Sequence, residues 1–543
     1  MRTPHSLRSR RWPLCAALVT ALAAAPAFSA TFNGSNAGAI PDGNLAGREI
    51  GFAVSGLQRG VRRVSLSVTM AHPWAADLTL TLVSPDGRAR LVLLGRPGLN
   101  RGAPSGNTVN FDGTYTFSDS AVGDLWATIA GQAEDFVVPP GSYRTTTAGR
   151  SGLSDIGGCS THLNRAFAGL GGSALNGQWT LHVVDSANGD LGTVSAATLT
   201  IETGPSLFSG GFEDGEPAAS PPPPASATRG RCLVTLFDYT GTGLSSYATV
   251  RNTGGGPNGA VTWTVRENDG TATGAVQEFE FGKASDTFLD GDFDGDGIRD
   301  ATVWRSGTKG HYLVRRSSRP DDVPLRITLG TTGDNPDIAG DYDGDNVTDG
   351  ALYRAGASAG LASTVEIRLS SDGSVRSFEA GENGDFPIGG LDYDADGAAD
   401  VAIQSNAGGG NASFEVFNGG SGAAGETFLF GKPTDVIVPG THAGTPRADV
   451  TVIRGVGGQL EWHVRDSQTG LAQPVVTFGA SATDFVLTGD YDGDGIYDPA
   501  VWRPGPLPAG GTFFVRRSSA PDTSFEVPGG ANSDYPPANG RNN

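Results

Sequence analysis

The chain has 543 residues, with 38 Lys and Arg against 58 Asp and Glu and a formal net charge of −20. This acidic balance excludes the basic surface that nucleic-acid binding requires, so we expect no nucleic-acid partner. With 82 glycines and only 18% charged residues, the composition favours strands and turns over helices. The 38% of hydrophobic residues is enough for several ordered cores.

The first 29 residues have the pattern of a secretory signal peptide. Four arginines between residues 2 and 11 precede the apolar run Leu14–Ala25, which is too short to span a bilayer. Small residues at Ala25 and Ala27, or at Ala27 and Ser29, fit a cleavage site. We therefore predict a signal peptide at 1–29 and a mature chain that is secreted, extracellular or at the cell surface. No later apolar run reaches 18 residues, so we expect no membrane span.

A linker divides the mature chain into two halves. Residues 204–230 are rich in Pro, Ala and Ser and contain Pro221–Pro224, which predicts a short, stiff polyproline spacer. The first half is 31–203 and the second is 231–543. Cys159 and Cys232 lie on either side of this spacer, and an even number of cysteines in a secreted chain allows one disulfide, with two unpaired thiols as the alternative.

Apolar and polar residues alternate in short runs through the first half. Leu78, Leu80 and Leu82 alternate with threonines, and Trp179 and Leu181 begin a similar run. Turn residues such as Gly, Pro and Asn bound these runs. The period of two in short bounded segments predicts an antiparallel β-sandwich.

Two segments of this half also carry a family resemblance. Met70–Gly87, which includes His72 and Asp77, and Asn176–Asp185 resemble the P domain that follows the catalytic domain in proprotein convertases, and the resemblance covers nearly all of 31–203. It implies a jelly-roll β-sandwich that stabilises an adjoining subtilisin-like serine protease without being catalytic. We interpret His72, Asp77 and Asp185 as structural residues.

No separate protease domain is visible in the sequence. The motif Gly356-Ala-Ser358-Ala-Gly360 has the form of a nucleophile elbow, which requires a strand before it and a helix after it. The residues that follow, Thr364–Leu369, alternate as a strand, so we predict a hairpin turn here. We predict no catalytic residues.

Repeats of about 50 residues fill the second half. A loop motif rich in aspartate starts at residues 292, 341, 392 and 490, with degraded copies at 238 and 441. About four short strands per repeat are typical of β-propeller blades, so we predict an all-β chain with a six-bladed propeller after the sandwich. A seven-bladed ring is the alternative. We expect Leu233–Phe237 to complete the last blade, because two prolines make Asp534–Ala538 a poor strand.

The loop motif predicts calcium sites. Aspartates at loop positions 1, 3, 5 and 9 and the carbonyl of position 7 supply hard oxygen ligands, which suit Ca²⁺, and Gly or Asn at position 6 permits the sharp turn. Turns that bind no metal are the alternative. We expect about four Ca²⁺ ions, and the predicted ligands are Asp292, Asp294, Asp296, Ile298 and Asp300; Asp341, Asp343, Asp345, Val347 and Asp349; Asp392, Asp394, Asp396, Ala398 and Asp400; and Asp490, Asp492, Asp494, Ile496 and Asp498.

The repeats resemble the FG-GAP or VCBS-type blades of integrin-like propellers, including Phe281-Gly282 and its equivalents. We therefore predict a secreted, non-enzymatic calcium-binding protein that acts in adhesion or recognises a protein or glycan at the propeller face. One alternative is a protease-associated factor whose P domain docks to a subtilisin-like protease. Another is a hydrolase or lyase with reactive groups in the central channel.

One recurring arginine has two interpretations. Arg305, Arg354, Arg454 and Arg503 follow one strand of their repeats at the same position. They form either salt bridges with neighbouring loop aspartates or a ring for an anionic ligand. We favour the salt bridges.

Overall fold

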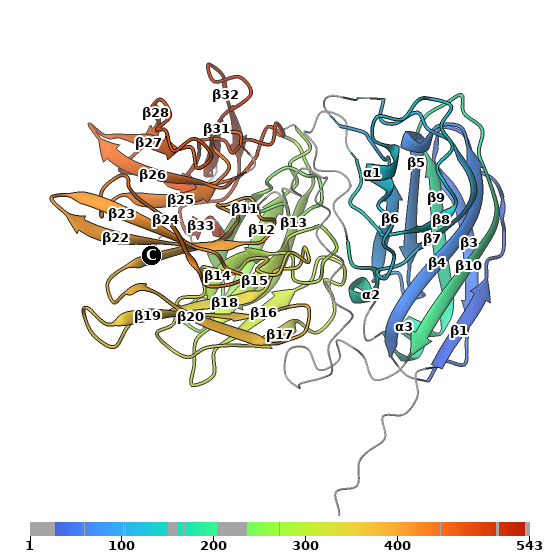
Figure 1. Cartoon of the computed structure of the whole chain (residues 1–543), viewed down its shortest axis with the longest axis horizontal. Helices are drawn as coiled ribbons and strands as arrows, with labels where there is room; N and C mark the ends of the chain where they lie inside the picture. The colour runs from blue at the N-terminus through green and yellow to red at the C-terminus, as the bar shows by residue number, and fades with distance from the viewer. Residues whose placement is uncertain are drawn as a thin grey trace, which may run out of the picture.

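The computed structural model describes residues 28–537 except 59, 101–102, 104, 150–160, 168–169, 204–235, 271, 446 and 507–509. The predicted signal peptide up to residue 27, the linker, Cys159 and Cys232 lie outside the described residues and stay predictions. Residues 28 and 29 already belong to the first strand. Figure 1 shows two β-rich parts, a sandwich (blue) and a set of blade-like sheets (green to red).

The first part is a sandwich of two sheets. Its described helices are short and connect the sheets: a 3-10 turn at Ala75–Asp77, α1 (Leu125–Ile129), α2 (Leu163–Ala166) and α3 (Gly172–Leu175). One sheet has the order β1 (Phe28–Asn33), β10 (Thr193–Thr203), β4 (Val61–His72), β7 (Phe111–Phe117) and β8 (Gly141–Tyr143), with β2 (Gly38–Ala39) beside β10; the other has the order β3 (Asn44–Val54), β9 (Gly177–Asp185), β5 (Leu78–Val83) and β6 (Arg90–Gly95).

The predicted alternation places one face of each sheet in a shared core. In β4 and β9, buried residues recur at every second position. Trp179 has no exposed surface, lies 5.0 Å from the ring of Phe167, and donates its indole N–H to the Leu175 carbonyl oxygen at 2.8 Å. The predicted β-sandwich is therefore confirmed.

The described residues of the second part form six sheets, one for each predicted repeat. In order they are β33 (Asp534–Tyr535), β11 (Tyr247–Asn252), β12 (Ala260–Arg266) and β13 (Val276–Lys283); β14 (Thr287–Gly291), β15 (Asp300–Arg305), β16 (His311–Arg315) and β17 (Leu325–Thr328); β18 (Gly350–Arg354), β19 (Ala362–Arg368) and β20 (Val375–Glu382); β21 (Phe386–Leu391), β22 (Asp400–Gly408), β23 (Asn411–Phe417) and β24 (Ala424–Leu429); β25 (Val436–Gly440), β26 (Asp449–Val456), β27 (Gln459–Arg465) and β28 (Val476–Ala480); and β29 (Phe485–Leu487), β30 (Ala500–Arg503), β31 (Thr512–Arg516) and β32 (Ser524–Pro528).

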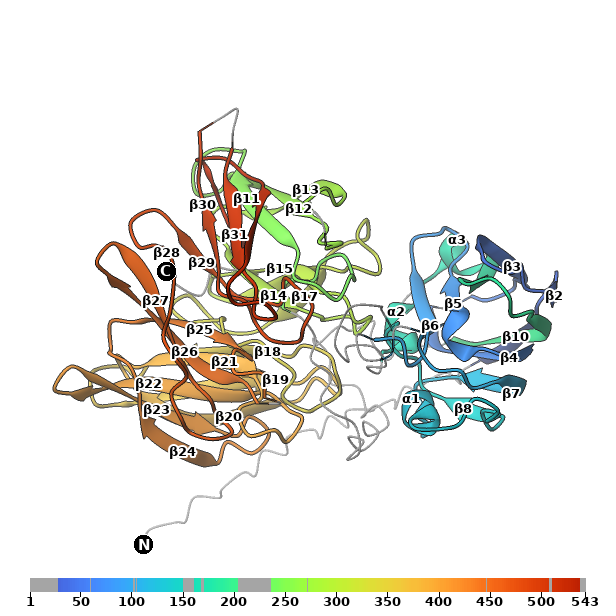
Figure 2. The same ribbon diagram turned by 90° about the horizontal axis from the view of Figure 1, so that it is seen from above.

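Apolar clusters join each sheet to the next and the last sheet to the first. Five clusters connect consecutive sheets. The sixth includes Tyr247 of the first sheet, whose ring lies 5.6 Å from Tyr491 and 5.3 Å from Phe513 of the last sheet. The sheets therefore follow one another in a propeller-like arrangement of six. Figure 2 shows these sheets from above, beside the blue-green sandwich.

The strand that joins the two ends of this arrangement differs from the prediction. Asp534 and Tyr535 pair with β11 and supply the innermost strand of the first sheet. The two prolines follow this strand instead of interrupting it, so they cost no hydrogen bond in the pairing. Leu236 and Phe237, the described end of the expected closing strand, lie in a turn.

The third sheet lacks a regular inner strand. In place of an inner strand, isolated bridges pair Asn335 with Tyr353 and Gly340 with Asp349. Pro336 has no N–H to donate in this segment, which shortens the pairing.

Among the described residues, no helix has the length and apolar character needed to cross a membrane.

Candidate metal centres

The aspartate loops connect the inner strand of a blade to its second strand. In the second sheet, β14 ends at Gly291, the loop begins at Asp292, and β15 begins at Asp300. The loop at 392–400 follows β21 and leads into β22 in the same way. Paired strands therefore fix both ends of these two loops, which positions their first and ninth residues. The loop at 490–498 lies between β29 and β30, and the loop at 341–349 leads into β18.

Each complete loop brings three carboxylates together. One oxygen from each of positions 1, 3 and 9 lies within 4.8 Å of the other two, a separation that lets one cation contact all three. Most of these side chains are buried; Asp394 is exposed. The four groups are Asp292, Asp294 and Asp300; Asp341, Asp343 and Asp349; Asp392, Asp394 and Asp400; and Asp490, Asp492 and Asp498.

Backbone N–H groups orient the carboxylates of positions 1 and 9. Asp292 accepts hydrogen bonds from Gly295 at 2.6 Å and Gly297 at 2.8 Å. Asp300 accepts from Phe293 at 2.8 Å and Ser317 at 2.6 Å. The same bonds recur in the other three loops.

The carboxylate at position 3 supplies the observation that points to a cation site. In Asp294, Oδ2 accepts the Ser318 hydroxyl at 2.5 Å, whereas Oδ1 is buried and accepts no hydrogen bond. Asp343 has the same arrangement, with Ser371 as the donor to Oδ2. A buried, unpartnered carboxylate oxygen is costly without a compensating charge. A Ca²⁺ ion bound by the three carboxylates would provide that charge.

Position 5 lies outside these groups of three. In the first complete loop, Asp296 Oδ1 accepts the Ile298 N–H at 2.9 Å and Oδ2 accepts the Ser317 hydroxyl at 2.8 Å. Asp345, Asp396 and Asp494 accept the corresponding N–H groups in their own loops. Their role as ligands, and that of the position 7 carbonyls, stays a prediction.

Burial and mutual repulsion make the metal-free carboxylates hard to ionise. Burial, followed by the charge of Asp294, raises the pKa of Asp292 to about 7. Burial, followed by the charge of Asp498, raises the pKa of Asp490 to about 8. A bound divalent cation removes this penalty because it stabilises the ionised carboxylates.

Two residues of each loop have left-handed backbone geometry. Position 6 has a positive φ in all four, including 63° at Asn346, as the sequence predicts. Position 4 has a positive φ as well. It is glycine in three loops, but Ala395 occupies it in the fourth with a φ of 67°. An alanine in this region is strained, so position 4 of the loop at 392–400 carries a local cost that the glycines at position 4 of the other three loops avoid.

Sequence reasoning missed the residues that support the loops. They follow the third strand in the four blades with complete aspartate loops and donate hydrogen bonds to positions 3 and 5. The signal was visible, since the sequence Arg-Arg-Ser-Ser occurs at both 315–318 and 516–519. These residues are Ser317 and Ser318, Ser370 and Ser371, Asn418, and Ser518 and Ser519.

The recurring arginines form salt bridges, as we favoured. Both nitrogens of the Arg305 fork contact Asp286, at 2.8 and 2.7 Å, and Arg503 contacts Asp484 at 2.6 and 2.8 Å. Arg354 pairs with Asp334. Asp334 also accepts the N–H of Thr331 at 2.9 Å, as Asp286 accepts the N–H of Lys283 at 2.8 Å in the preceding repeat.

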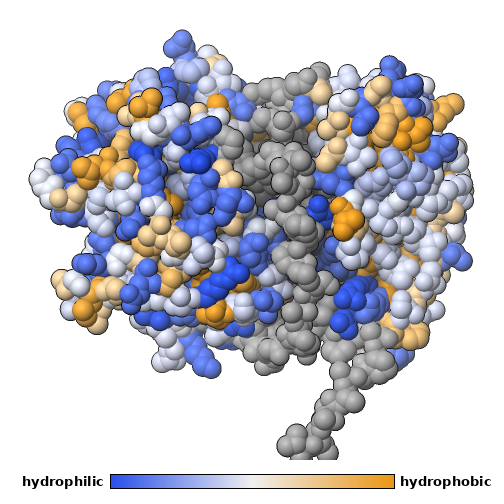
Figure 3. Space-filling model, viewed as in Figure 1, coloured by the Kyte–Doolittle hydropathy of each residue, from blue (hydrophilic) through white to orange (hydrophobic). Residues whose placement is uncertain are grey.

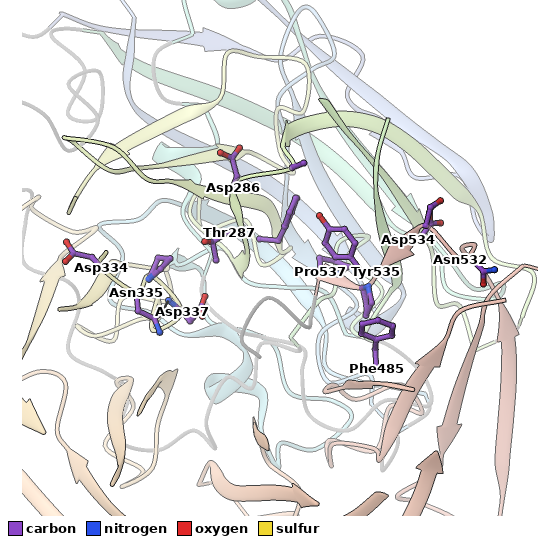
Figure 4. A pocket seen from close by; sticks show the side chains of 15 residues that line it. Asp286, Thr287, Asp334, Asn335, Asp337, Phe485, Asn532, Asp534, Tyr535 and Pro537 are labelled. Atoms are coloured by element: carbon purple, nitrogen blue, oxygen red, sulfur yellow. Dashed lines mark hydrogen bonds between the residues drawn. The ribbon is translucent and has the colours of Figure 1, made fainter. Parts of the chain in front are cut away.

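A pocket of about 700 Å³ lies at the opposite end of the inner strands from the aspartate loops. Figure 4 shows Thr287, Asn335, Asp337, Phe485 and Tyr535 around it. In the second and sixth sheets, the inner strands β14 and β29 begin at this pocket and run toward the aspartate loops. The pocket combines aromatic side chains with carboxylate and amide groups, as ligand pockets do.

His72, Asp77 and Asp185, which we interpreted as structural residues, lie in structural surroundings. His72 Nε2 lies 3.2 Å from Asp185 Oδ2, and neither side chain has exposed surface. Burial, followed by the charge of Asp185, raises the pKa of Asp77. Ser358 is exposed in the hairpin between β18 and β19, so the predicted turn is confirmed.

On the face shown in Figure 3, apolar side chains are scattered among polar ones. Val122 and Leu45, which are 88% and 73% exposed, are examples of exposed apolar residues in the sandwich. Scattered residues of this kind are normal for a protein surface. They give no reason to place a site on that face.

Comparisons with known proteins identify no family. No protein-family model matches the sequence, and no curated protein matches it. Among solved structures, the serine protease of Aeromonas sobria in complex with its chaperone is 18% identical over 34% of this chain, with a TM-score of 0.18. The chain covers 27% of that protein, about a quarter of its length.

Two further structures are similar to the chain at a comparable level. AofleA from Arthrobotrys oligospora is 9% identical, with 54% of this chain and 89% of that chain covered and a TM-score of 0.29. The rhamnogalacturonan lyase YesW is 13% identical, with 51% and 68% covered and a TM-score of 0.23. These likenesses are too weak to assign a function.

Proposed function

We propose that the chain is a secreted, non-enzymatic calcium-binding protein whose propeller-like part recognises a protein or glycan. The observation that carries this proposal is the convergence of three carboxylates in each of four loops, together with the buried oxygens of Asp294 and Asp343 that have no hydrogen-bond partner. Oxygen ligands in this number and geometry favour Ca²⁺ over softer metals. The resemblance of the loops to FG-GAP and VCBS-type blades supports the same conclusion.

The residues at positions 1, 3 and 9 would hold the ion. In the loops at 292–300 and 392–400, position 1 follows the inner strand directly and position 9 begins the second strand. Calcium supplies positive charge that links these two strands and stabilises four acidic loops. The ion therefore has a structural role. It holds the sheets in the arrangement that forms the pocket at the start of the inner strands.

The pocket at the start of the inner strands is the proposed recognition site. Phe485 is 36% exposed there, and Asn335, Asp337 and Asn532 contribute polar groups. Apolar faces combined with a few polar groups suit a sugar ring or a short segment of a protein. In this arrangement, calcium stabilises one end of the blades and the ligand binds at the opposite end, away from the metal ions.

A protease-associated role is the second candidate. The sandwich at 28–203 and the resemblance of its sequence to the P domain of proprotein convertases support it. In this case the sandwich would dock to a separate subtilisin-like protease. Co-purification of the mature chain with such a protease, and loss of the complex without residues 31–203, would favour this role.

Metal analysis combined with a glycan array tests the proposal. The mature chain, dialysed against calcium, should retain about four ions per molecule. Phe485→Ala should lose array binding and keep its calcium, whereas Phe525→Ala, outside the pocket, should keep both. A chain that retains no calcium would contradict the metal assignment, and equal binding by the two variants would contradict the pocket assignment.

A further inference from the structure

The sandwich contacts two of the four aspartate loops through one short segment. His162, which precedes α2, donates its backbone N–H to the Gly295 carbonyl oxygen at 2.8 Å. Its Nε2 lies 2.6 Å from the Asp345 carbonyl oxygen. Both acceptors are backbone groups inside predicted calcium loops, at position 4 of one loop and position 5 of the next. The position of the sandwich therefore depends on the shape of these loops.

Arg165 extends this contact into the carboxylates of the second loop. Its guanidinium donates to the Ser370 carbonyl oxygen at 2.7 Å and lies 3.5 Å from Asp345 Oδ2. Ser370 in turn donates its hydroxyl to Asp345 at 3.1 Å and its N–H to Asp349 at 2.6 Å. One network thus connects the sandwich to positions 5 and 9 of this loop.

The segment that carries His162 and Arg165 is held in place from within the sandwich. The two oxygens of Asp119 accept the N–H groups of Leu163 and Asn164, each at 2.8 Å. Arg165 is only 9% exposed. The sandwich therefore presents a fixed surface, and the loops are the part of the contact that a metal ion can reshape.

Close packing against the sandwich distinguishes the loop at 292–300 from the loop at 392–400. A Cβ atom at Gly295 would lie 2.8 Å from His162 Cδ2, and one at Gly297 would lie 2.5 Å from Thr147 Cγ2. The glycines at positions 4 and 6 thus let the sandwich approach the loop backbone. In the loop at 392–400, position 4 is Ala395, and a Cβ atom at Gly397 would meet nothing within 4 Å.

We propose that calcium in the loops at 292–300 and 341–349 holds the sandwich against the propeller-like part, and that loss of calcium from these two loops releases it. Without the ion, the repulsion of four carboxylates loosens each loop and moves the Gly295 and Asp345 carbonyls that His162 contacts. The loops at 392–400 and 490–498 instead bond to neighbouring blades, where Asp392 accepts the N–H of Ala448 and Asp490 accepts the N–H of Ser245. This inference rests on the proposed calcium binding.

Hydrogen exchange of the mature chain, combined with small-angle scattering, tests the inference. The matched variants are Asp343→Asn, in a loop that faces the sandwich, and Asp492→Asn, at the same position of a loop in the sixth blade. In calcium, Asp343→Asn should accelerate exchange at residues 161–167 by about tenfold and increase the radius of gyration, because a local contact has opened. Asp492→Asn should change neither quantity.

Arg165→Ala provides a second test that leaves every predicted metal ligand intact. It should bind as many calcium ions as the unaltered chain and still lose protection at residues 161–167. Two results would overturn the inference while leaving the proposed function standing. One is equal protection of residues 161–167 from exchange in all three variants. The other is a chain that binds calcium but has the same exchange and the same radius of gyration in calcium and in EDTA. A chain that binds no calcium in calorimetry would overturn both.

Discussion

Ala395→Gly tests the left-handed geometry of the aspartate loops. Ala395 occupies position 4 with a φ of 67°, whereas glycine occupies this position in the other three loops. Its side chain is exposed, so the substitution removes little packing. The variant should therefore relieve backbone strain without opening a cavity.

The expected gain follows from two opposing costs. Left-handed geometry costs an L-residue about 1–2 kcal/mol, and the extra freedom of glycine in the unfolded chain offsets about 0.4–1 kcal/mol of the relief. The net stabilisation should be about 0.5–1 kcal/mol. Gly344→Ala is the matched reversal, because Gly344 has a φ of 74° and its added Cβ would meet only the Gly397 carbonyl oxygen at 3.5 Å. It should destabilise the chain by a similar amount.

Urea unfolding in saturating calcium measures both variants against the unaltered chain. Because the surface exposed on unfolding is unchanged, the midpoints should shift in opposite directions at a constant slope. A destabilised Ala395→Gly variant, or no shift in either variant, would show that position 4 is not left-handed in solution. The shared geometry of the four loops would then be wrong.

Three further predictions concern pH, ion pairs and the closing strand. In EDTA, the free energy of unfolding should fall as pH rises from about 5 to 8. The pKa of Asp292 is raised to about 7 and that of Asp490 to about 8, so the folded chain binds protons that the unfolded chain releases. A free energy of unfolding that rises over this range would contradict the pKa shifts. Arg305→Ala should cost about 2 kcal/mol in urea unfolding, because it leaves the buried carboxylate of Asp286 without its ion pair, and Arg305→Lys should recover part of the loss. Truncation before Asp534 should lower the melting temperature by several degrees, because it removes the strand that pairs with β11; an unchanged melting temperature would show that this strand does not join the first and last blades.

Local patterns predicted most of the fold. Alternating residues in strands such as Leu78–Val83 have their apolar side buried, as a period of two requires. The spacing of the aspartate loops gave one repeat for each of the six sheets. These features depend on residues close together in the sequence, which is why the sequence alone reveals them.

Long-range pairing was harder to predict. Nothing local in Asp534–Tyr535 shows that it pairs with β11, nearly 300 residues earlier, and the following prolines misled the assignment. The contact of His162 with Gly295 and Asp345 was missed for the same reason. The serines after the third strands were a different case, because their repetition was visible and only the geometry shows that they support the aspartates.

Calorimetric titration of the mature chain with calcium, accompanied by melting curves in calcium and in EDTA, tests the central claim most directly. We expect about four bound ions and a large increase in melting temperature, because binding to the folded chain alone stabilises it by mass action. Proton release on binding should accompany the heat at pH 6–7, where the metal-free carboxylates are partly protonated. No heat and identical melting curves would show that the aspartate loops are turns that bind no metal.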